Sequence, residues 1–371
     1  MKPLKKYLML SLITVVAFIQ SCAPIANNIV SSNRCDNFYD NVPIVGGGID
    51  NYNSYRNNRY KINIANDKST ITVKAEFKGV SGRIYLLNSA GSYVVYSSAA
   101  LSPSIEDFVV DKAGIYYVVL NSNEPGTYSL DICGGVSSVE VINADKKSFD
   151  SQNMVTGGGN DAYNSWRNKR FTFDVTEDNS NIDFVMKSKA TNCRMYILNS
   201  AGNYISYSGN GVYEQISPLN LKKGTYNIVV CGEYGKTTNF DLAIYSKSGV
   251  VINPSNVNST TFSKKYGSFS LAGGVDAYNS LQNRKFSFTV NSTTYIDLIG
   301  NSYGLNCRMY LLNSAGNYTN YGANGVYSSI EQLQVISGTY TVVMCGDKDK
   351  NGTFDVILYS KEGAVTDLVA K

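Results

Sequence analysis

The sequence predicts an all-β protein, with three tandem antiparallel β-sandwich or jelly-roll domains behind a helical N-terminal signal peptide. First, the sequence at 193–204 recurs almost unchanged at 307–318 and with more substitutions at 82–93, so the chain is a threefold array. Second, short β-branched and aromatic runs alternate with turns of Gly, Asn, Asp and Ser. Third, no window beyond the first 22 residues keeps helical spacing.

Residues 1–21 have the pattern of a signal peptide. Lysines at positions 2, 5 and 6 precede an apolar run at 8–19, and a small residue then leads into Cys22. This arrangement resembles a bacterial lipoprotein signal, which implies that Cys22 is acylated and becomes the new N-terminus. An ordinary secretory signal that leaves Cys22 as a thiol is the alternative. With Ala23 next, the resemblance implies the outer membrane, with residues 22–34 as a tether that holds the protein to the membrane through its lipid.

The three repeats are expected at 35–143, 148–252 and 262–365, joined by linkers at 143–147 and 253–261. Each repeat has a little over 100 residues and can bury a core of its own. In the second repeat, strands are expected at 170–175, 181–186, 194–198, 214–221, 224–231 and 239–245. The Asn-Ser-Ala-Gly at 199–202 predicts a hairpin turn in which Gly202 takes positive φ.

Six cysteines remain after Cys22, an even number in an exported chain. The two in the second repeat are 38 residues apart, as are the two in the third, and both are absent from the aligned positions of the first. This joint absence predicts disulfides within the second and third repeats and leaves one for the first; the expected pairs are Cys193–Cys231, Cys307–Cys345 and Cys35–Cys133.

The order of strands and turns resembles the bacterial pre-peptidase C-terminal domain family. In the third repeat the resemblance is carried by Phe286-Ser-Phe288, 310–316, Ser329-Ile330, 338–343 and 353–357. Such domains are small β-sandwiches that usually accompany secreted hydrolases, and some bind polymers such as collagen, sometimes with calcium. Here only the tether precedes the repeats, which argues against a role as an enzyme accessory.

Two patterns are candidates for calcium binding. A glycine-rich block before the first strand of each repeat places an Asp three residues before an Asn, at Asp50, Asp161 and Asp276. These residues equally suit turn caps, because Asp and Asn bond nearby backbone N–H groups. A second stretch, with Asp347, Asp349 and Asn351, has the 1-3-5 spacing of a calcium loop but lacks its final Glu, so a polar turn is the alternative.

The sequence has 29 tyrosines, one tryptophan and no histidine. Tyrosines that share a face would form an aromatic platform for sugar rings or for an aromatic-rich protein; the alternative is that they fill half-buried strand surface. The candidates follow the central hairpin of the second and third repeats, at Tyr204, Tyr207, Tyr213, Tyr318, Tyr321 and Tyr327.

Composition excludes several function classes. Without histidine there is no Ser-His-Asp, Cys-His or His-metal site, and the chain is expected not to be an enzyme. The formal charge of +4 falls to +1 once three lysines leave with the signal, so there is no electrostatic case for nucleic acid. The sequence therefore predicts a lipid-anchored envelope protein with three repeated modules for multivalent adhesion or for carbohydrate or protein binding; a structural spacer without a ligand is the alternative.

Overall fold

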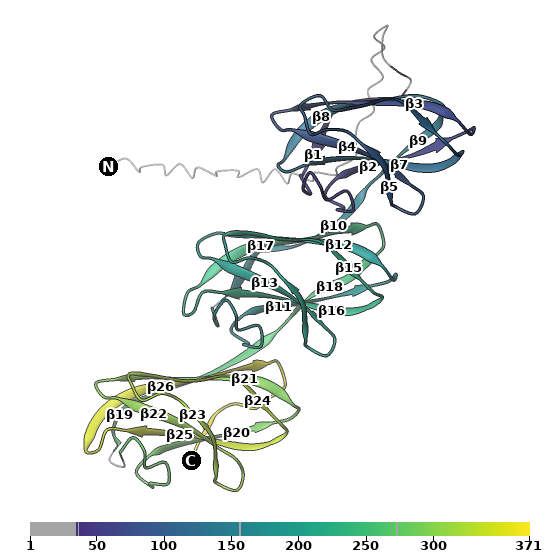
Figure 1. The fold of residues 1–371 in the computed structure, drawn as a ribbon. Helices are drawn as coiled ribbons and strands as arrows, with labels where there is room; N and C mark the ends of the chain where they lie inside the picture. Colours follow the sequence, from purple (N-terminus) through teal and green to yellow (C-terminus); the bar gives the residue numbers. More distant parts are fainter. Residues whose placement is uncertain (1–34, 36, 156, 272–273) are drawn as a thin grey trace, which may run out of the picture. The chain divides into compact units, whose positions relative to one another are not determined.

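A computed structural model describes residues 35, 37–155, 157–271 and 274–371 (Figure 1). The predicted signal peptide, the predicted lipidation site Cys22 and the predicted tether at 22–34 lie outside these residues. The described residues form strands and turns without a helix, which confirms the all-β prediction. Accordingly, this part of the chain contains no helix of the length and apolarity needed to cross a membrane.

Each repeat has nine strands among the described residues, arranged as a four-stranded and a five-stranded antiparallel sheet. The strands of the first repeat are β1 (Asn37–Ile44), β2 (Asn58–Ile64), β3 (Ser69–Lys78), β4 (Gly82–Asn88), β5 (Tyr93–Tyr96), β6 (Ser104–Val110), β7 (Gly114–Ser122), β8 (Gly126–Gly134) and β9 (Val136–Ile142). Its sheets have the orders β1-β8-β3-β6 and β5-β4-β7-β2-β9.

The second and third repeats have the same topology. The second contains β10 (Ala144–Val155), β11 (Lys169–Val175), β12 (Ser180–Ser188), β13 (Cys193–Asn199), β14 (Tyr204–Tyr207), β15 (Tyr213–Leu221), β16 (Gly224–Gly232), β17 (Thr238–Lys247) and β18 (Val251–Val257). The third contains β19 (Ser259–Leu271), β20 (Arg284–Val290), β21 (Thr294–Tyr303), β22 (Cys307–Leu312), β23 (Tyr318–Tyr321), β24 (Tyr327–Val335), β25 (Gly338–Gly346), β26 (Lys350–Lys361) and β27 (Val369–Ala370). The sheet orders are β10-β17-β12-β15 with β14-β13-β16-β11-β18, and β19-β26-β21-β24 with β23-β22-β25-β20-β27.

The predicted linkers differ from the structure, because their residues continue the strands. β10 begins at Ala144, and β18 and β19 occupy nearly all of 253–261. The described residues form two compact units: those up to residue 45 with 59–143, and 46–58 with those from 144 onward. The loop 46–58 thus belongs to the unit that contains the second and third repeats.

Each repeat has its own apolar core between its two sheets. In the second repeat the alternation of β11 turns Phe171 and Phe173 inward against Phe184 and Phe240, all fully buried. The same positions carry Phe286, Phe288, Leu298 and Phe354 in the third repeat. Separate cores of this kind explain why the predicted threefold repetition appears as three sandwiches.

The Asn-Ser-Ala-Gly turn forms as predicted. Gly202 has a φ of 85°, and Asn199 Oδ1 accepts hydrogen bonds from the N–H groups of Ala201 and Asn203, each at 3.0 Å. The same turn recurs after Asn88 and after Asn313. It delivers the chain into the short edge strands β5, β14 and β23, where the candidate tyrosines lie.

Candidate binding surface and repeat junctions

Four tyrosines of the second repeat form a cluster that we call a tyrosine platform. Tyr204 and Tyr207 are 50% and 55% exposed, and their ring centroids lie 5.9 Å apart. Beneath them, the ring of buried Tyr196 lies 6.0 Å from Tyr204 and 5.7 Å from Tyr207. Tyr163 completes the cluster, with its ring 5.4 Å from that of Tyr204. The exposed rings therefore stand on a packed aromatic base, which limits their conformational freedom.

The platform recurs in the other repeats. In the third, Tyr318 and Tyr321 are 49% and 54% exposed and pack on Tyr310 and Tyr278. In the first, the described ring contacts join Tyr85, Tyr93 and Tyr96, with the last two about half exposed. In each repeat, the two tyrosines of the short edge strand are therefore neighbours and about half exposed.

A β-bulge puts the two exposed tyrosines on one face. Residues three apart in a regular strand point to opposite faces. In β14, Tyr207 pairs with Tyr196 and Tyr204 with Leu198, and the register shifts between these pairs. The extra residue brings both tyrosines to the same side of the sheet. The same shift occurs between β4 and β5 and between β22 and β23, so the Tyr-x-x-Tyr spacing depends on the bulge.

An arginine borders each platform. The Arg194 guanidinium lies 5.6 Å from the centroid of the Tyr207 ring, and the equivalent Arg308 and Arg83 lie 5.7 Å from Tyr321 and 5.4 Å from Tyr96. Arg194 also donates to Asp161, which accepts a second hydrogen bond of 3.0 Å from the Tyr196 hydroxyl. Burial and this hydrogen bond help raise the pKa of Tyr196 to about 12, so the phenol stays protonated.

The calcium candidates do not converge in the described structure. Asp161 and Asp276 pair with Arg194 and Arg308, and Asp50 is exposed on its loop. Asp347 accepts from Lys350 Nζ at 3.2 Å, while Asn351 lies in β26. Within the described ranges, no three His, Cys, Asp or Glu side chains are placed to share a metal ion. Calcium binding stays a prediction, and the structure favours neither candidate stretch over the other.

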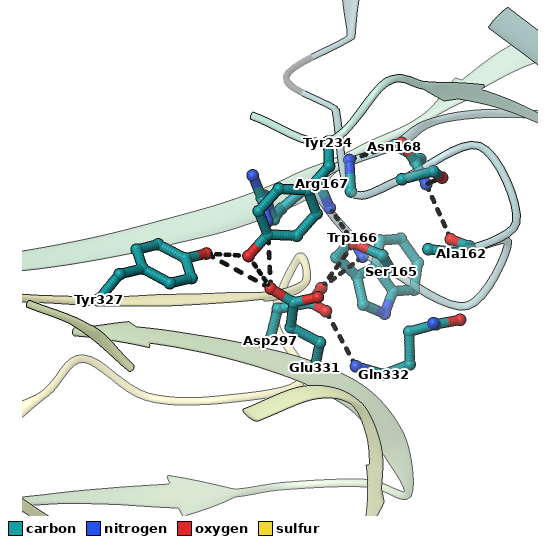
Figure 2. A network of polar contacts seen from close by, with 12 residues as sticks. Ala162, Ser165, Trp166, Arg167, Asn168, Tyr234, Asp297, Tyr327, Glu331 and Gln332 are labelled. Carbon is teal, nitrogen blue, oxygen red and sulfur yellow. Dashed lines mark hydrogen bonds and ion pairs between the residues drawn. The ribbon is translucent and has the colours of Figure 1, made fainter. Parts of the chain in front are cut away.

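A second recurring arrangement joins neighbouring repeats, and it centres on a buried aspartate. Asp297 of β21 has no exposed surface. Its Oδ2 accepts hydrogen bonds from Ser165 Oγ at 3.0 Å and from Trp166 N–H at 2.9 Å, while its Oδ1 accepts from Gln332 N–H at 2.9 Å (Figure 2). Three donors thus hold one carboxylate between the second repeat's loop and the third repeat.

Asp183 occupies the same place in β12. It is fully buried, and its Oδ2 accepts a 2.8 Å hydrogen bond from the N–H of Tyr55 in the loop 46–58. Burial raises the pKa of Asp183 and of Asp297, and hydrogen bonds from the serine and from the next N–H of each loop lower it in part. We call each such contact a repeat junction: a Ser-aromatic pair that donates to an aspartate of the next repeat.

An arginine follows the Ser-aromatic pair at both junctions. Arg56 donates to Gln215 and, at 3.1 Å, to the hydroxyl of Tyr213. Arg167 is 8% exposed, lies 3.4 Å from Glu331 and stacks 4.8 Å from the Tyr234 ring centroid. Figure 2 shows Tyr234, Tyr327 and Glu331 gathered around this guanidinium.

This placement corrects part of the predicted tyrosine site. Tyr213 and Tyr327 lie on β15 and β24, in the other sheet from the platforms, and bond at the junctions. Sequence reasoning also missed Asp183 and Asp297. A usable signal was present: the loop arginine occurs in the first two repeats only, while the aspartate and the junction tyrosine occur in the last two only.

The disulfide prediction is confirmed for one pair and wrong for two. Cys35 and Cys133 are bonded, with their Cα atoms 5.4 Å apart. Cys193, Cys231, Cys307 and Cys345 are separate buried thiols. In the ladder Cys193 faces Gly232 while Cys231 faces Arg194, so the two cysteines are on neighbouring pairs and point to opposite faces of the sheet. Cys307 and Cys345 have the same offset.

A packing exchange explains why the first repeat lacks one of these cysteines. Gly82 occupies the position of Cys193, and a Cβ built on it would lie 2.0 Å from the Phe77 ring. The residue equivalent to Phe77 is Ser188 in the second repeat and Ser302 in the third. A large ring beside glycine in the first repeat therefore replaces serine beside cysteine in the other two. The joint absence of the two cysteines from the first repeat therefore does not indicate a bond between them.

Comparisons with known proteins do not assign this chain to a family. No family model matches the chain, and no curated protein matches it. Two solved structures resemble it at 12% sequence identity. The first, "The Triple Jelly Roll Fold and Turret Assembly in an Archaeal Virus", aligns over 87% of this chain and 84% of the viral chain, with a TM-score of 0.18. The second, "Life in the extremes: atomic structure of Sulfolobus Turreted Icosahedral Virus", aligns over 81% of this chain and 80% of the viral chain, with a TM-score of 0.17. At these TM-scores the likeness carries no inference about this chain.

Proposed function

We propose that the protein is a lipid-anchored surface or envelope protein that binds a glycan or protein partner through its three tyrosine platforms. The lipid on Cys22 holds it at the outer membrane, and the sandwich or jelly-roll modules present the platforms. The resemblance to pre-peptidase C-terminal domains points the same way, since some of those domains bind polymers. Three weak sites on one chain give avidity to a repetitive ligand without a strong single contact.

The recurrence of an ordered, exposed tyrosine pair beside an arginine supports this proposal best. Tyr207 and Tyr321 are each more than half exposed, although large aromatic side chains are usually covered. The rings offer apolar faces for sugars, and the neighbouring Arg194 or Arg308 offers hydrogen bonds to hydroxyl or carboxylate groups. The same chemistry suits an aromatic-rich protein surface.

The test is a glycan and matrix-protein array, probed with and without calcium. Alanine replaces Tyr96, Tyr207 or Tyr321 singly, in pairs and together, and Tyr303→Ala is the control because Tyr303 is 56% exposed and lies outside the platforms. Avidity should fall stepwise with each lost platform, by roughly 100-fold or more in the triple variant. An array signal that the triple variant retains in full would refute binding through the platforms.

The alternative, a structural spacer of the envelope, draws on the junctions. Fully buried Asp297 connects the second and third repeats, and fully buried Asp183 holds the loop 46–58, through bonds that a freely jointed array does not need. A spacer predicts that the triple tyrosine variant keeps its envelope function while junction variants lose it. The two candidates are therefore separated by the same set of proteins.

A further inference from the structure

The loop that serves as the donor at each repeat junction exists a third time, and among the described residues no aspartate of another repeat accepts from it. In the third repeat this loop contains Ser280, Leu281 and Gln282, aligned with Ser165, Trp166 and Arg167. Leu281 is 94% exposed, whereas Ser165 is 1% exposed and Arg167 is 8% exposed. Among the described residues, no group accepts a hydrogen bond from the N–H of Leu281.

The loop 280–282 already has the conformation of the loops at 54–56 and 165–167, which bond to an aspartate. The N–H of Gln282 donates to Ser280 Oγ at 3.2 Å, the distance found from Arg167 to Ser165 and from Arg56 to Ser54. The N–H of Ser280 donates to Ala277 O at 2.9 Å, as the loops before it do at 2.9 and 3.0 Å. Docking therefore requires little reordering of the backbone, which favours affinity.

We propose that the Ser280–Gln282 loop is a docking surface for a second protein that presents an acidic strand edge. The partner's carboxylate accepts from Ser280 Oγ and from the N–H of Leu281, as Asp297 accepts from Ser165 and Trp166. The Leu281 side chain takes the place of the aromatic ring and is covered on docking. The chemistry of the partner follows from the two junctions in this chain, each of which seats such a loop on a buried carboxylate.

A second copy of this chain does not supply that carboxylate. Asp183 and Asp297 are occupied, and the first repeat has Thr72 at the equivalent position of β3. Thr72 Oγ1 accepts from the N–H of Asp107, in the way that Asp297 Oδ1 accepts from Gln332. The acidic side chain of the first repeat is instead Asp107, which lies at the register shift on the neighbouring strand β6 and is exposed. Head-to-tail growth of identical chains, the usual risk of such an interface, is thereby blocked.

The test builds a defined acidic edge on the full chain. Thr72→Asp with Asp107→Gln recreates the Asp297 and Gln332 pair of the third repeat without changing the net charge. The matched control, Thr70→Asp with Asp107→Gln, has the same composition but places the carboxylate two residues earlier on β3. Circular dichroism verifies that each variant is folded. If the Thr72→Asp/Asp107→Gln chain is unfolded, the single variant Thr72→Asp is used in its place.

Sedimentation velocity over a concentration series gives the self-association constant. The Thr72→Asp/Asp107→Gln chain should form head-to-tail oligomers at least about tenfold more tightly than the wild type or the control, because each hydrogen bond to a charged group is worth about that factor or more. Adding Leu281→Asp, on a fully exposed side chain, should return it to the monomer, and Ser280→Ala should weaken association by about tenfold.

Three results would overturn the proposal. In one, the Thr72→Asp/Asp107→Gln chain folds but remains as monomeric as the wild type, so that the loop does not bind a carboxylate edge. In another, association persists unchanged with Leu281→Asp, so that a different surface is responsible. In the third, the wild type itself associates as tightly, so that the occupant is a second copy of this chain. The tyrosine platforms are unchanged in these variants, so the outcome is independent of the proposed ligand binding.

Discussion

Replacing Asp297 by alanine tests whether the junction between the second and third repeats contributes to stability. The change removes a carboxylate that accepts three hydrogen bonds of 2.9 to 3.0 Å and leaves the N–H groups of Trp166 and Gln332 without that acceptor. A buried donor left unsatisfied costs about 1–3 kcal/mol. Relief from burying the carboxylate, whose pKa is raised by that burial, offsets part of the loss. We expect a net destabilisation of about 2–4 kcal/mol.

The chain carries its own reporter for this measurement. Trp166 is the one tryptophan, and its backbone bonds directly to Asp297. Urea unfolding followed by Trp166 fluorescence should show a midpoint lower by about 1–2 M, for a dependence of about 1–3 kcal/mol per M of urea. Asp297→Asn keeps one acceptor oxygen and should lie between the wild type and the alanine variant.

Asp183→Ala is the matched control, because it removes the same kind of carboxylate from the junction with the loop 46–58. Because the two aspartates share no hydrogen-bond partner, the losses of Asp183→Ala and Asp297→Ala should add within about 0.5 kcal/mol in the double variant. A Trp166 midpoint that does not move in Asp297→Ala, or a double variant whose loss departs clearly from the sum of the single losses, would refute the view that each junction is held by its own aspartate.

Three further predictions concern the junction arginine, the free thiols and the first core. Arg167→Gln copies Gln282 of the third repeat and should lower the Trp166 transition by about 1–2 kcal/mol. Alkylation in denaturant without reductant, read by peptide mass spectrometry, should label the cysteines at 193, 231, 307 and 345 but not those at 35 and 133; a 193–231 disulfide peptide would contradict this. In the native protein the reaction should be slow, since the thiols are buried and burial raises the pKa of Cys345 to about 12. Gly82→Cys should destabilise the first repeat by about 1–3 kcal/mol in thermal unfolding, and Phe77→Ser should be less damaging in its presence than alone.

The repeat, the strands and the central turn could be predicted because each depends on residues close in sequence. Asn199 and Gly202 specify their turn by their own side chain and φ, and the alternation in β11 specifies its buried face. Pairing across strands could not be predicted in the same way. Cys193 and Cys231 share a sheet, and a one-residue offset in register turns them to opposite faces.

The bulge at the platforms is a second case in which sequence spacing does not show which side chains are neighbours. The Tyr-x-x-Tyr spacing of 204 and 207 predicts opposite faces in a regular strand, and only the register shift against β13 makes the two rings neighbours. Spacing by itself therefore could not show that Tyr204 and Tyr207 are neighbours, or that Tyr213 lies in the other sheet. The platform is a property of the sheet edge and requires the strand pairing to be known.

The junctions explain why the repeats differ at their ends. If each repeat were an independent module, its loop arginine and its strand aspartate would be kept or lost together. Instead the arginine is present at 56 and 167 and replaced by Gln282, whereas the aspartate is present at 183 and 297 and replaced by Thr72. The two residues are offset by one repeat because each junction takes its donor from one module and its acceptor from the next. Because each repeat of a stacked array contacts only its neighbours, the donor and the acceptor of one junction are expected to lie in different repeats. The unit that the sequence specifies is therefore the junction as well as the sandwich, and the donor loop around Leu281 is the half junction for which we propose a second protein.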